Sequence, residues 1–258
     1  MLARFNRKRR KMTQPLSTPT VRSGGFTFKQ FFVAHDRCAM KVGTDGILLG
    51  AWAPLPKEGR LLDIGCGSGV IALMLAQRTL GRLSVDGVEL DVAAGQQAKE
   101  NAAASPWRDQ VTIYTADIAD FAGQNRNQYA LIVSNPPYFA PGVSCRSESR
   151  TQARYTTSLT HQELLRCAKA KLMTEGLFCV VLPYDVAEAF IPQAEKEGWC
   201  LSLRTDVREF ASRPAHRTLL ALSLMPGVAE RSSLVIRDDD GHYSDAYRAL
   251  TSNFYLSM

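Results

Sequence analysis

The stretch from about Arg60 to Glu197 repeats one pattern: a short apolar run, a turn, and then an amphipathic helical segment. Apolar runs of strand length that alternate with helices indicate parallel strands with helices on both faces of the sheet. The expected strands cover residues 60–64, 83–88, 111–114, 130–134 and 177–182. The expected helices cover residues 70–77, 92–104, 118–121, 161–173 and 186–197. The sequence therefore predicts an open α/β sheet.

The regions on either side of this stretch follow other patterns. Two apolar runs, at residues 200–207 and 218–224, are joined by a polar loop, as two antiparallel strands would be. With the five parallel strands they predict a seven-stranded, mostly parallel sheet that ends in an antiparallel hairpin. Residues 25–52 are expected to form a ribbon, a glycine-bounded loop and a helix, and residues 230–258 a strand and a final helix at 244–255.

The chain has 258 residues, which suits one α/β domain. We predict a single domain at residues 25–258, with its core at 60–225, behind a basic leader at residues 1–24. Residues 1–25 hold seven lysines and arginines and no acid, so the rest of the chain has a net charge of −1. The leader is interpreted as disordered, as a start placed too far upstream, or as a phosphate-binding tail.

The six cysteines include no Cys-x-x-Cys pair, and several lie in apolar runs. This pattern indicates free cysteines of a reduced, cytoplasmic protein and predicts no structural zinc or other metal. Neither a secretory h-region nor an apolar run near the ~18 residues of a membrane span is present in the sequence. Secretion and membrane insertion are therefore not expected.

Three glycines, Gly65, Gly67 and Gly69, follow the first predicted strand directly. Glycines this dense let the backbone approach a ligand closely. A dinucleotide fingerprint would place another glycine after two intervening residues, at position 70, where this chain has Val70. The turn therefore favours a cofactor loop of another kind and disfavours an NAD enzyme.

Acidic residues follow the next two predicted strands. Glu89 could accept hydrogen bonds from both hydroxyls of a ribose, and Asp117 from an adenine amino group while Ile118 packs on the ring. Each acid taken alone is also a common helix-capping or loop residue. Their place at successive strand ends, beside the glycine turn, favours a nucleoside site.

At this point the chain resembles the class I S-adenosylmethionine-dependent methyltransferases, over roughly residues 41–225. The resemblance implies that the loop at 63–69, including Asp63, holds the methionine part of the cofactor. It also implies that Glu89 holds the ribose and Asp117 the adenine. Lys41 and Thr44, in a loop before the first strand, are expected at the carboxylate end of the cofactor; a helix cap formed by Thr44 or Asp45 is the alternative.

The run Asn135-Pro-Pro-Tyr138 follows the fourth predicted strand, where it would lie beside the methyl donor. Pro136 and Pro137 make the turn stiff, since proline fixes φ and has no N–H. The Asn135 side-chain oxygen and the Pro136 carbonyl can hold the two hydrogens of a planar amine, so that its lone pair points at the methyl group. Tyr138 would stack on the flat acceptor. These residues are the predicted catalytic set, and Asn135 is also counted among the predicted cofactor-binding residues.

This tetrapeptide resembles the motif of methyltransferases that act on adenine N6 and of those that act on glutamine N5 in release factors. The second kind carries a sizeable helical domain before the glycine loop, whereas residues 25–52 resemble a bacterial group of tRNA adenine-N6 methyltransferases. That group modifies the adenosine beside the anticodon of a valine tRNA. The resemblance implies tRNA as the partner. A protein glutamine methyltransferase, and a non-enzymatic RNA-binding factor on the same fold, remain the alternatives.

An adenosine in a stacked anticodon loop must be extruded before its N6 can react, at a cost of a few kcal/mol. Phosphate contacts would supply part of that free energy. The candidate RNA-binding residues are arginines in the loop after the tetrapeptide and in the C-terminal hairpin: Arg146, Arg150, Arg154, Arg204, Arg208, Arg213 and Arg217. A solvated charged face is the alternative for both groups, and His216 beside them is interpreted as a surface or packing residue.

Overall fold

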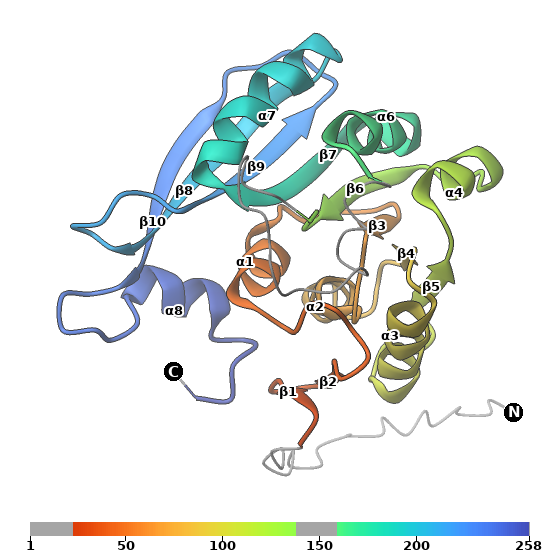
Figure 1. The fold of residues 1–258 in the computed structure, drawn as a ribbon, viewed down its shortest axis with the longest axis horizontal. Coiled ribbons are helices and arrows are strands. Elements are labelled where there is room, and N and C mark those ends of the chain that lie inside the picture. The colour runs from red at the N-terminus through yellow and green to blue at the C-terminus, as the bar shows by residue number, and fades with distance from the viewer. Residues whose placement is uncertain (1–22, 138–158, 258) are drawn as a thin grey trace, which may run out of the picture.

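The computed structural model describes residues 23–137 and 159–257. Its centre is an eight-stranded sheet of order β10-β8-β9-β7-β6-β3-β4-β5 (Figure 1). Five strands of this sheet run parallel: β3 (Leu61–Ile64), β4 (Val85–Glu89), β5 (Val111–Thr115), β6 (Tyr129–Ser134) and β7 (Leu172–Pro183). The repeated strand–helix pattern therefore predicted the parallel part of the sheet correctly.

The C-terminal part adds three strands: β8 (Cys200–Phe210), β9 (Arg217–Ser223) and β10 (Glu230–Arg237). β9 is antiparallel to both β7 and β8, which confirms the predicted hairpin. β10 pairs parallel to β8, so the sheet has eight strands and the predicted count of seven was wrong. The first four residues of β10 are polar and exposed, and only Leu234 and Ile236 are buried, so the run carries little of the apolar signal of a strand.

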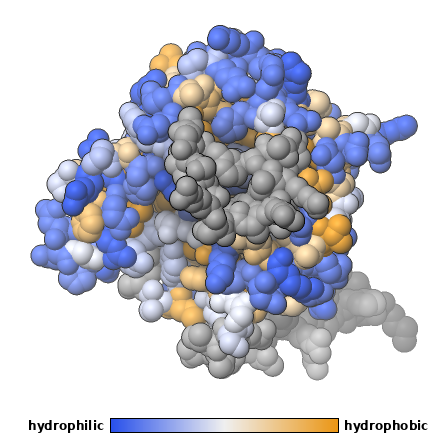
Figure 2. Space-filling model, in the orientation of Figure 1, coloured by the Kyte–Doolittle hydropathy of each residue, from blue (hydrophilic) through white to orange (hydrophobic). Residues whose placement is uncertain are grey.

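Helices cover both faces of the sheet, and each face has its own apolar core. One core includes residues of α1 (Thr44–Trp52), α2 (Val70–Arg78), α3 (Val92–Ala104) and α8 (Asp245–Thr251). The other includes residues of α4 (Ile118–Gln124), α6 (His161–Lys171) and α7 (Tyr184–Lys196). Hydrophilic residues dominate the surface over α7, at the top of the view (Figure 2), as the outward side of an amphipathic helix requires.

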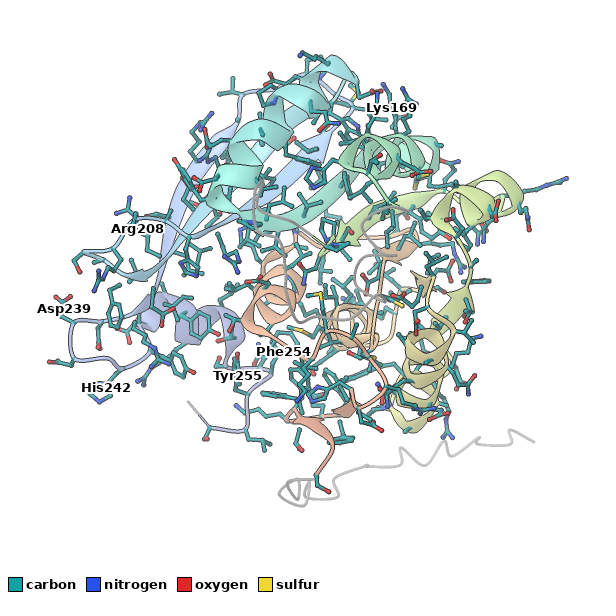
Figure 3. All side chains as sticks on the ribbon, viewed as in Figure 1. Lys169, Arg208, Asp239, His242, Phe254 and Tyr255 are labelled. Atoms are coloured by element: carbon teal, nitrogen blue, oxygen red, sulfur yellow. The ribbon has the colours of Figure 1, made fainter. Side chains whose placement is uncertain are left out.

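The two ends of the described chain meet on the α2 side of the sheet. An antiparallel ribbon of β1 (Gly25–Thr27) and β2 (Phe32–Ala34) begins the fold, and the rings of Phe28 and Phe31 stack beyond β1. The Lys29 N–H donates to the carbonyl of Phe254 at 2.8 Å, and Tyr255 lies edge-on to Phe26 (Figure 3). The final helix ends at Thr251, so the predicted helix to residue 255 was too long. Phe254 and Tyr255, which follow the helix, contact the ribbon instead.

The described cysteines, Cys38, Cys66, Cys167, Cys179 and Cys200, are free thiols. Among the helices of the described residues, none is both long and apolar enough to cross a membrane.

Candidate active site

A cavity of about 630 Å³ lies where the carboxyl ends of β3 to β6 meet. One side of it, here called the strand-end wall, consists of residues that directly follow these four strands: Gly65–Ser68, Glu89–Leu90, Ala116–Ile118, Asn135 and Pro137. In an open α/β sheet, ligands bind outside the carboxyl ends of the strands. The predicted cofactor residues Gly65, Gly67, Glu89, Asp117 and Ile118 all line this cavity.

The glycine loop turns with three left-handed residues, at φ values of +69° (Gly65), +52° (Gly67) and +80° (Gly69). Side chains disfavour this region by roughly 1–2 kcal/mol, which accounts for glycine at each position. The Gly65 N–H donates to the Val88 carbonyl at 2.8 Å, which ties the loop to the end of β4. Gly69 precedes α2 and packs near Ala98; it is not among the described residues that line the cavity.

The Glu89 carboxylate is fixed in place by two backbone donors. Its Oε2 accepts from the Gly67 N–H at 2.8 Å and its Oε1 from the Asp91 N–H at 2.9 Å. Burial raises the pKa of Glu89, and the backbone donors act in the opposite direction. Because each carboxylate oxygen has two lone pairs, both retain capacity to accept from a ligand hydroxyl.

Asp117 caps a helix and also lies in the cavity lining, where the predicted contact with the adenine would be made. Its carboxylate accepts from the Ala119 N–H at 2.7 Å and so caps α4. It also lines the cavity together with Ile118. The two interpretations of this acid are therefore compatible, because the cap uses one oxygen and the helix start holds the residue at the end of β5.

Asn135 stands at the end of β6, which is tied to β3 by the hydroxyl of Ser134 donating to the Ile64 carbonyl at 2.9 Å. The Asn135 Oδ1 is buried and has no hydrogen-bond partner among the described residues. A buried polar atom without a partner is costly in a native protein, so such an atom in a cavity marks a place for a ligand donor. Pro137 lines the cavity and Tyr138 lies outside the described residues, whereas Pro136 is not among the lining residues.

Asp63 is fully buried and is not among the described residues that line the cavity, so it would support the predicted cofactor loop from behind. Its Oδ2 accepts from the Ala72 N–H at 3.1 Å and holds α2 against β3. Its Oδ1 is buried without a partner among the described residues. Burial raises the pKa of Asp63 to about 7, with a smaller contribution from the charge of Glu89.

A second part of the cavity lining, here called the N-terminal wall, consists of residues 38–41 and 43–46. Lys41 and Thr44 line the cavity as predicted. The N-cap of α1 is Gly43, without a side-chain cap bond, so the alternative that Thr44 or Asp45 caps this helix was wrong. Residues 43–46, at the start of α1, line the cavity, and the first N–H groups of a helix have no partner within the helix.

His216 and Arg217 reach the same cavity from the turn between β8 and β9. The Arg217 Nε donates to the Asp45 Oδ2 at 2.9 Å, which links this turn to the N-terminal wall. The sequence interpretation missed Asp45 and His216 as cavity residues. The contact between Asp45 and Arg217 joins residues 172 positions apart, and no local pattern indicates such a pairing.

The candidate RNA-binding arginines that the structure describes differ in burial. Arg204 is 6% exposed and pairs with Glu188 at 2.6 Å and Asp206 at 2.9 Å, so its predicted phosphate contact does not fit the structure. Arg208 and Arg213 are exposed on β8 and in the turn after it. The remaining three candidates, Arg146, Arg150 and Arg154, lie outside the described residues.

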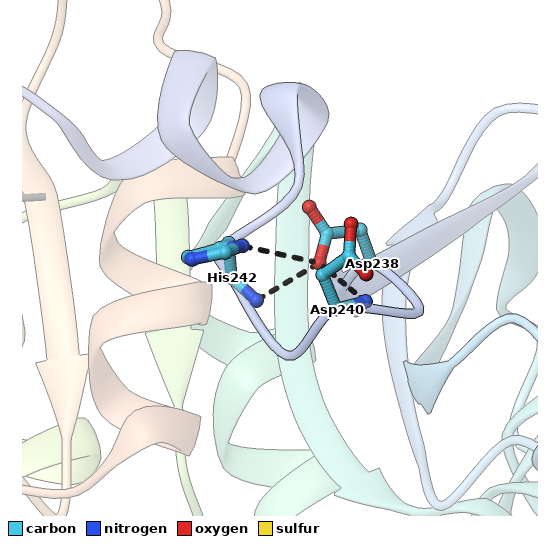
Figure 4. A group of neighbouring side chains, drawn as sticks. All are labelled: Asp238, Asp240 and His242. Carbon is cyan, nitrogen blue, oxygen red and sulfur yellow. Dashed lines mark hydrogen bonds and ion pairs between the residues drawn. The ribbon is translucent and has the colours of Figure 1, made fainter.

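Within the described part of the chain, one group of possible metal ligands lies outside the cavity. Asp238, Asp240 and His242 are exposed in the turn between β10 and α8 (Figure 4). The Asp238 Oδ1 accepts from the N–H groups of Asp240 and His242, at 3.1 and 2.8 Å. These bonds are those of a side-chain-stabilised turn, which accounts for the grouping without an ion.

Comparisons with known proteins agree with this geometry. Residues 42–192 match the family model described as the methyltransferase small domain. A tRNA1(Val) (adenine(37)-N6)-methyltransferase of Dickeya chrysanthemi is 59% identical, over 96% of this chain and 100% of that protein. Among solved structures, a predicted O-methyltransferase of Agrobacterium tumefaciens superposes with a TM-score of 0.63 at 17% identity, covering 81% of this chain and 96% of that one. A glycopeptide N-methyltransferase complexed with S-adenosylhomocysteine gives 0.52 at 14%, covering 71% and 91%. The chain therefore belongs to the methyltransferase small-domain family and, within it, to the bacterial tRNA1(Val) (adenine(37)-N6)-methyltransferases.

Proposed function

We propose that the protein transfers a methyl group from S-adenosylmethionine to N6 of an adenosine in tRNA. The substrate is the adenosine on the 3′ side of the anticodon in tRNA1(Val), in line with the name of the Dickeya relative. The observation that carries the proposal is the buried, unpartnered Oδ1 of Asn135 in the cavity wall. An exocyclic amino group is the kind of donor that this atom lacks.

The residues of the two walls fit the parts of S-adenosylmethionine. The backbone of Gly65–Ser68 allows close approach of the methionine part, and both oxygens of Glu89 are oriented for the ribose hydroxyls. Asp117 and Ile118 suit the edge and the face of the adenine. The Lys41 ammonium and the N–H groups that begin α1 would provide positive charge for the methionine carboxylate of the cofactor.

The acceptor site would be formed by the turn after β6. When bound, the cofactor supplies an electrophilic methyl group. Asn135 Oδ1 and the Pro136 carbonyl would accept the two N6 hydrogens, which favours a pyramidal nitrogen with its lone pair toward the methyl carbon. The bond from N6 to the methyl carbon would form as the bond from that carbon to sulfur breaks, with S-adenosylhomocysteine as the leaving group, and the cationic amine would lose a proton to water. Alignment of the two reactants is worth up to roughly 7–11 kcal/mol in well-oriented systems.

The tRNA must release the target base from its stack, and cationic side chains near the cavity would help to hold the backbone meanwhile. Arg208 and Arg213 are exposed beside the turn that carries His216 and Arg217 into the cavity. Their guanidinium groups suit phosphate oxygens. We propose that this turn, and not the buried Arg204, approaches the anticodon stem-loop.

The test is single-turnover methylation of a tRNA1(Val) transcript by wild type, Asn135→Ala and Asn135→Asp. Removing one preorganised group typically costs about 10²–10³ in rate, so Asn135→Ala should lose at least about 100-fold. Asn135→Asp keeps an acceptor oxygen and should retain more of the rate than Asn135→Ala. S-adenosylmethionine affinity, measured by calorimetry, should stay within about threefold of wild type, since the missing partner belongs to the acceptor.

The matched control is Asn253→Ala, because Asn253 is exposed and contributes only its backbone carbonyl to a hydrogen bond with Gln77. Its rate should equal that of wild type. A wild-type rate in Asn135→Ala at saturating cofactor would contradict the proposal.

A further inference from the structure

The buried side of α3 presents a carboxamide that joins the strand-end wall to the segment before the N-terminal wall. Asn101 is 5% exposed, and its Nδ2 donates to the Ala34 carbonyl at 2.8 Å and to the Ser68 carbonyl at 2.9 Å. Its Oδ1 accepts from the Ala34 N–H at 3.0 Å. Ala34 ends β2 in the N-terminal segment, whereas Ser68 lies in the glycine loop. One side chain therefore joins two segments that are far apart in sequence.

A second amide one turn earlier holds the residues that follow β2. The Gln97 Oε1 accepts from the Arg37 N–H at 2.9 Å, and its Nε2 donates to Asp36 Oδ1 at 2.7 Å. Glu100 of the same helix pairs with the Arg37 guanidinium. Residues 34–37 are thus fixed to α3 by backbone and side-chain contacts, and α3 itself begins directly beyond the Glu89 end of β4.

This fixed segment leads directly into the N-terminal wall. Cys38 is the first residue of that wall, and its thiol lies 3.4 Å from the Gln97 Oε1. The His35 Nδ1 accepts from the Val42 N–H at 3.1 Å, which closes the loop back on its start. The position of residues 38–42 relative to the glycine loop therefore depends on the hydrogen bonds and the ion pair between α3 and residues 34–37.

We propose that Asn101 is a positioning residue that sets the separation of the two walls and thereby the affinity for S-adenosylmethionine. The proposal rests on the proposed function in one respect, that this cofactor occupies the cavity. Asn101 is not among the residues that line the cavity; it acts through Ser68 on the strand-end wall and through Ala34, in the segment that leads into the N-terminal wall. Loss of the bridge lets the walls separate, so cofactor binding weakens while the acceptor geometry at Asn135 is kept.

The test compares Asn101→Asp with wild type by calorimetry with S-adenosylmethionine and by steady-state kinetics with tRNA. Aspartate keeps the acceptor for the Ala34 N–H but places an oxygen against the carbonyls of Ala34 and Ser68. The expected result is a Kd and a KM for S-adenosylmethionine raised about tenfold or more, since a lost charged or buried hydrogen bond has that effect. The kcat at saturating cofactor and the KM for tRNA should stay within about twofold.

Two further variants separate positioning from general stability. Gln97→Ala loosens the N-terminal wall but leaves the Ser68 bridge, so its Kd should rise by a smaller factor of about three to five. Lys99→Ala, on the exposed side of the same helix, should leave the Kd unchanged. If Asn101→Asp does not fold, hydrogen exchange at the Ala34 amide of the wild-type protein tests the proposal instead. S-adenosylhomocysteine should slow this exchange at least tenfold relative to the protein without ligand.

Each outcome bears on one proposal. A wild-type Kd in folded Asn101→Asp, a fall in kcat with KM unchanged, or Ala34 exchange that ignores the ligand would overturn the role of Asn101. Absence of any binding by the wild-type protein would instead overturn the proposed function, and with it the basis of this inference.

Discussion

The two walls of the cavity are built from contacts of different range. On the strand-end wall, Glu89 bonds the N–H two residues on and Asp117 does the same, and the glycine loop directly follows its strand. The N-terminal wall follows residues 34–37, which are held by contacts that bridge 60 to 67 positions. The comparison teaches that local motifs place the residues of the first wall at strand ends, although Glu89 also bonds Gly67 over 22 positions, whereas the second wall has no such motif and depends on how distant elements pack.

Glu89→Ala should produce the largest change and tests how much the strand-end wall contributes. It removes two hydrogen bonds from backbone N–H groups to a carboxylate, each worth about 1.5–3 kcal/mol, as well as the acceptors for the ribose. We expect the Kd for S-adenosylmethionine, measured by calorimetry, to rise on the order of 100–1,000-fold. Glu58→Ala, at an exposed carboxylate, is the control. If the Kd rises less than tenfold, most of the binding free energy for S-adenosylmethionine comes from the N-terminal wall.

The carboxyl of Asp63, which holds α2 against β3, should make the free energy of unfolding depend on pH. Its pKa of about 7 in the folded protein lies above its ordinary value of 3.8, so the folded state binds more protons between these values. Stability contributed by Asp63 is therefore present at low pH and lost as pH rises toward 7, by roughly 1.4 kcal/mol per unit. The carboxamide of an Asp63→Asn variant has no proton to lose in this range, so the variant lacks this dependence.

Urea unfolding of wild type and Asp63→Asn at pH 5, 6 and 7 measures this dependence. The difference in free energy of unfolding, wild type minus variant, should fall as pH rises. A difference that stays constant across the three pH values would refute the raised pKa.

Gly67→Ala asks whether backbone conformation alone shapes the strand-end wall. A Cβ at Gly67 would meet no atom within 4 Å, so the cost is that of φ +52° for alanine, about 1–2 kcal/mol. We expect unfolding in urea to report that loss. Gly123→Ala in α4 is the matched control, because it also has open space but an ordinary helical φ, and it should be neutral or stabilising. Equal effects of the two substitutions would show that the left-handed turn is unimportant.

His35→Ala tests the N-terminal wall and should give the smallest effect. Burial and the nearby Lys41 lower the pKa of His35, which keeps its Nδ1 an acceptor for the Val42 N–H at neutral pH. Loss of this single bond, about 0.5–1.5 kcal/mol, should raise the KM for S-adenosylmethionine roughly two- to tenfold without changing kcat. His242→Ala, at an exposed histidine, should behave as wild type. A fall in kcat instead would place His35 closer to the chemistry than its contacts indicate.

The same difference in range explains which parts were predictable from sequence. The parallel strands, the antiparallel hairpin and the glycine loop followed from local periodicity and from residues that suit positive φ. β10 was not counted as a strand of the sheet, because its polar first half pairs only with β8 at the edge. Arg204 was taken for an RNA contact because charge is visible in a sequence but its partner Glu188 is not. Asn101 gave no signal, since an isolated asparagine on a helix has no distinguishing pattern.

The proposed reaction predicts where a transferred methyl group should be found. Wild-type protein incubated with methyl-labelled S-adenosylmethionine and separate samples of tRNA, ribosomal RNA and release factor allows that atom to be traced. After digestion of the tRNA to nucleosides, the label should appear in N6-methyladenosine, and Asn135→Ala should yield almost none. Label in glutamine of the release factor, or in another nucleoside, would contradict the account.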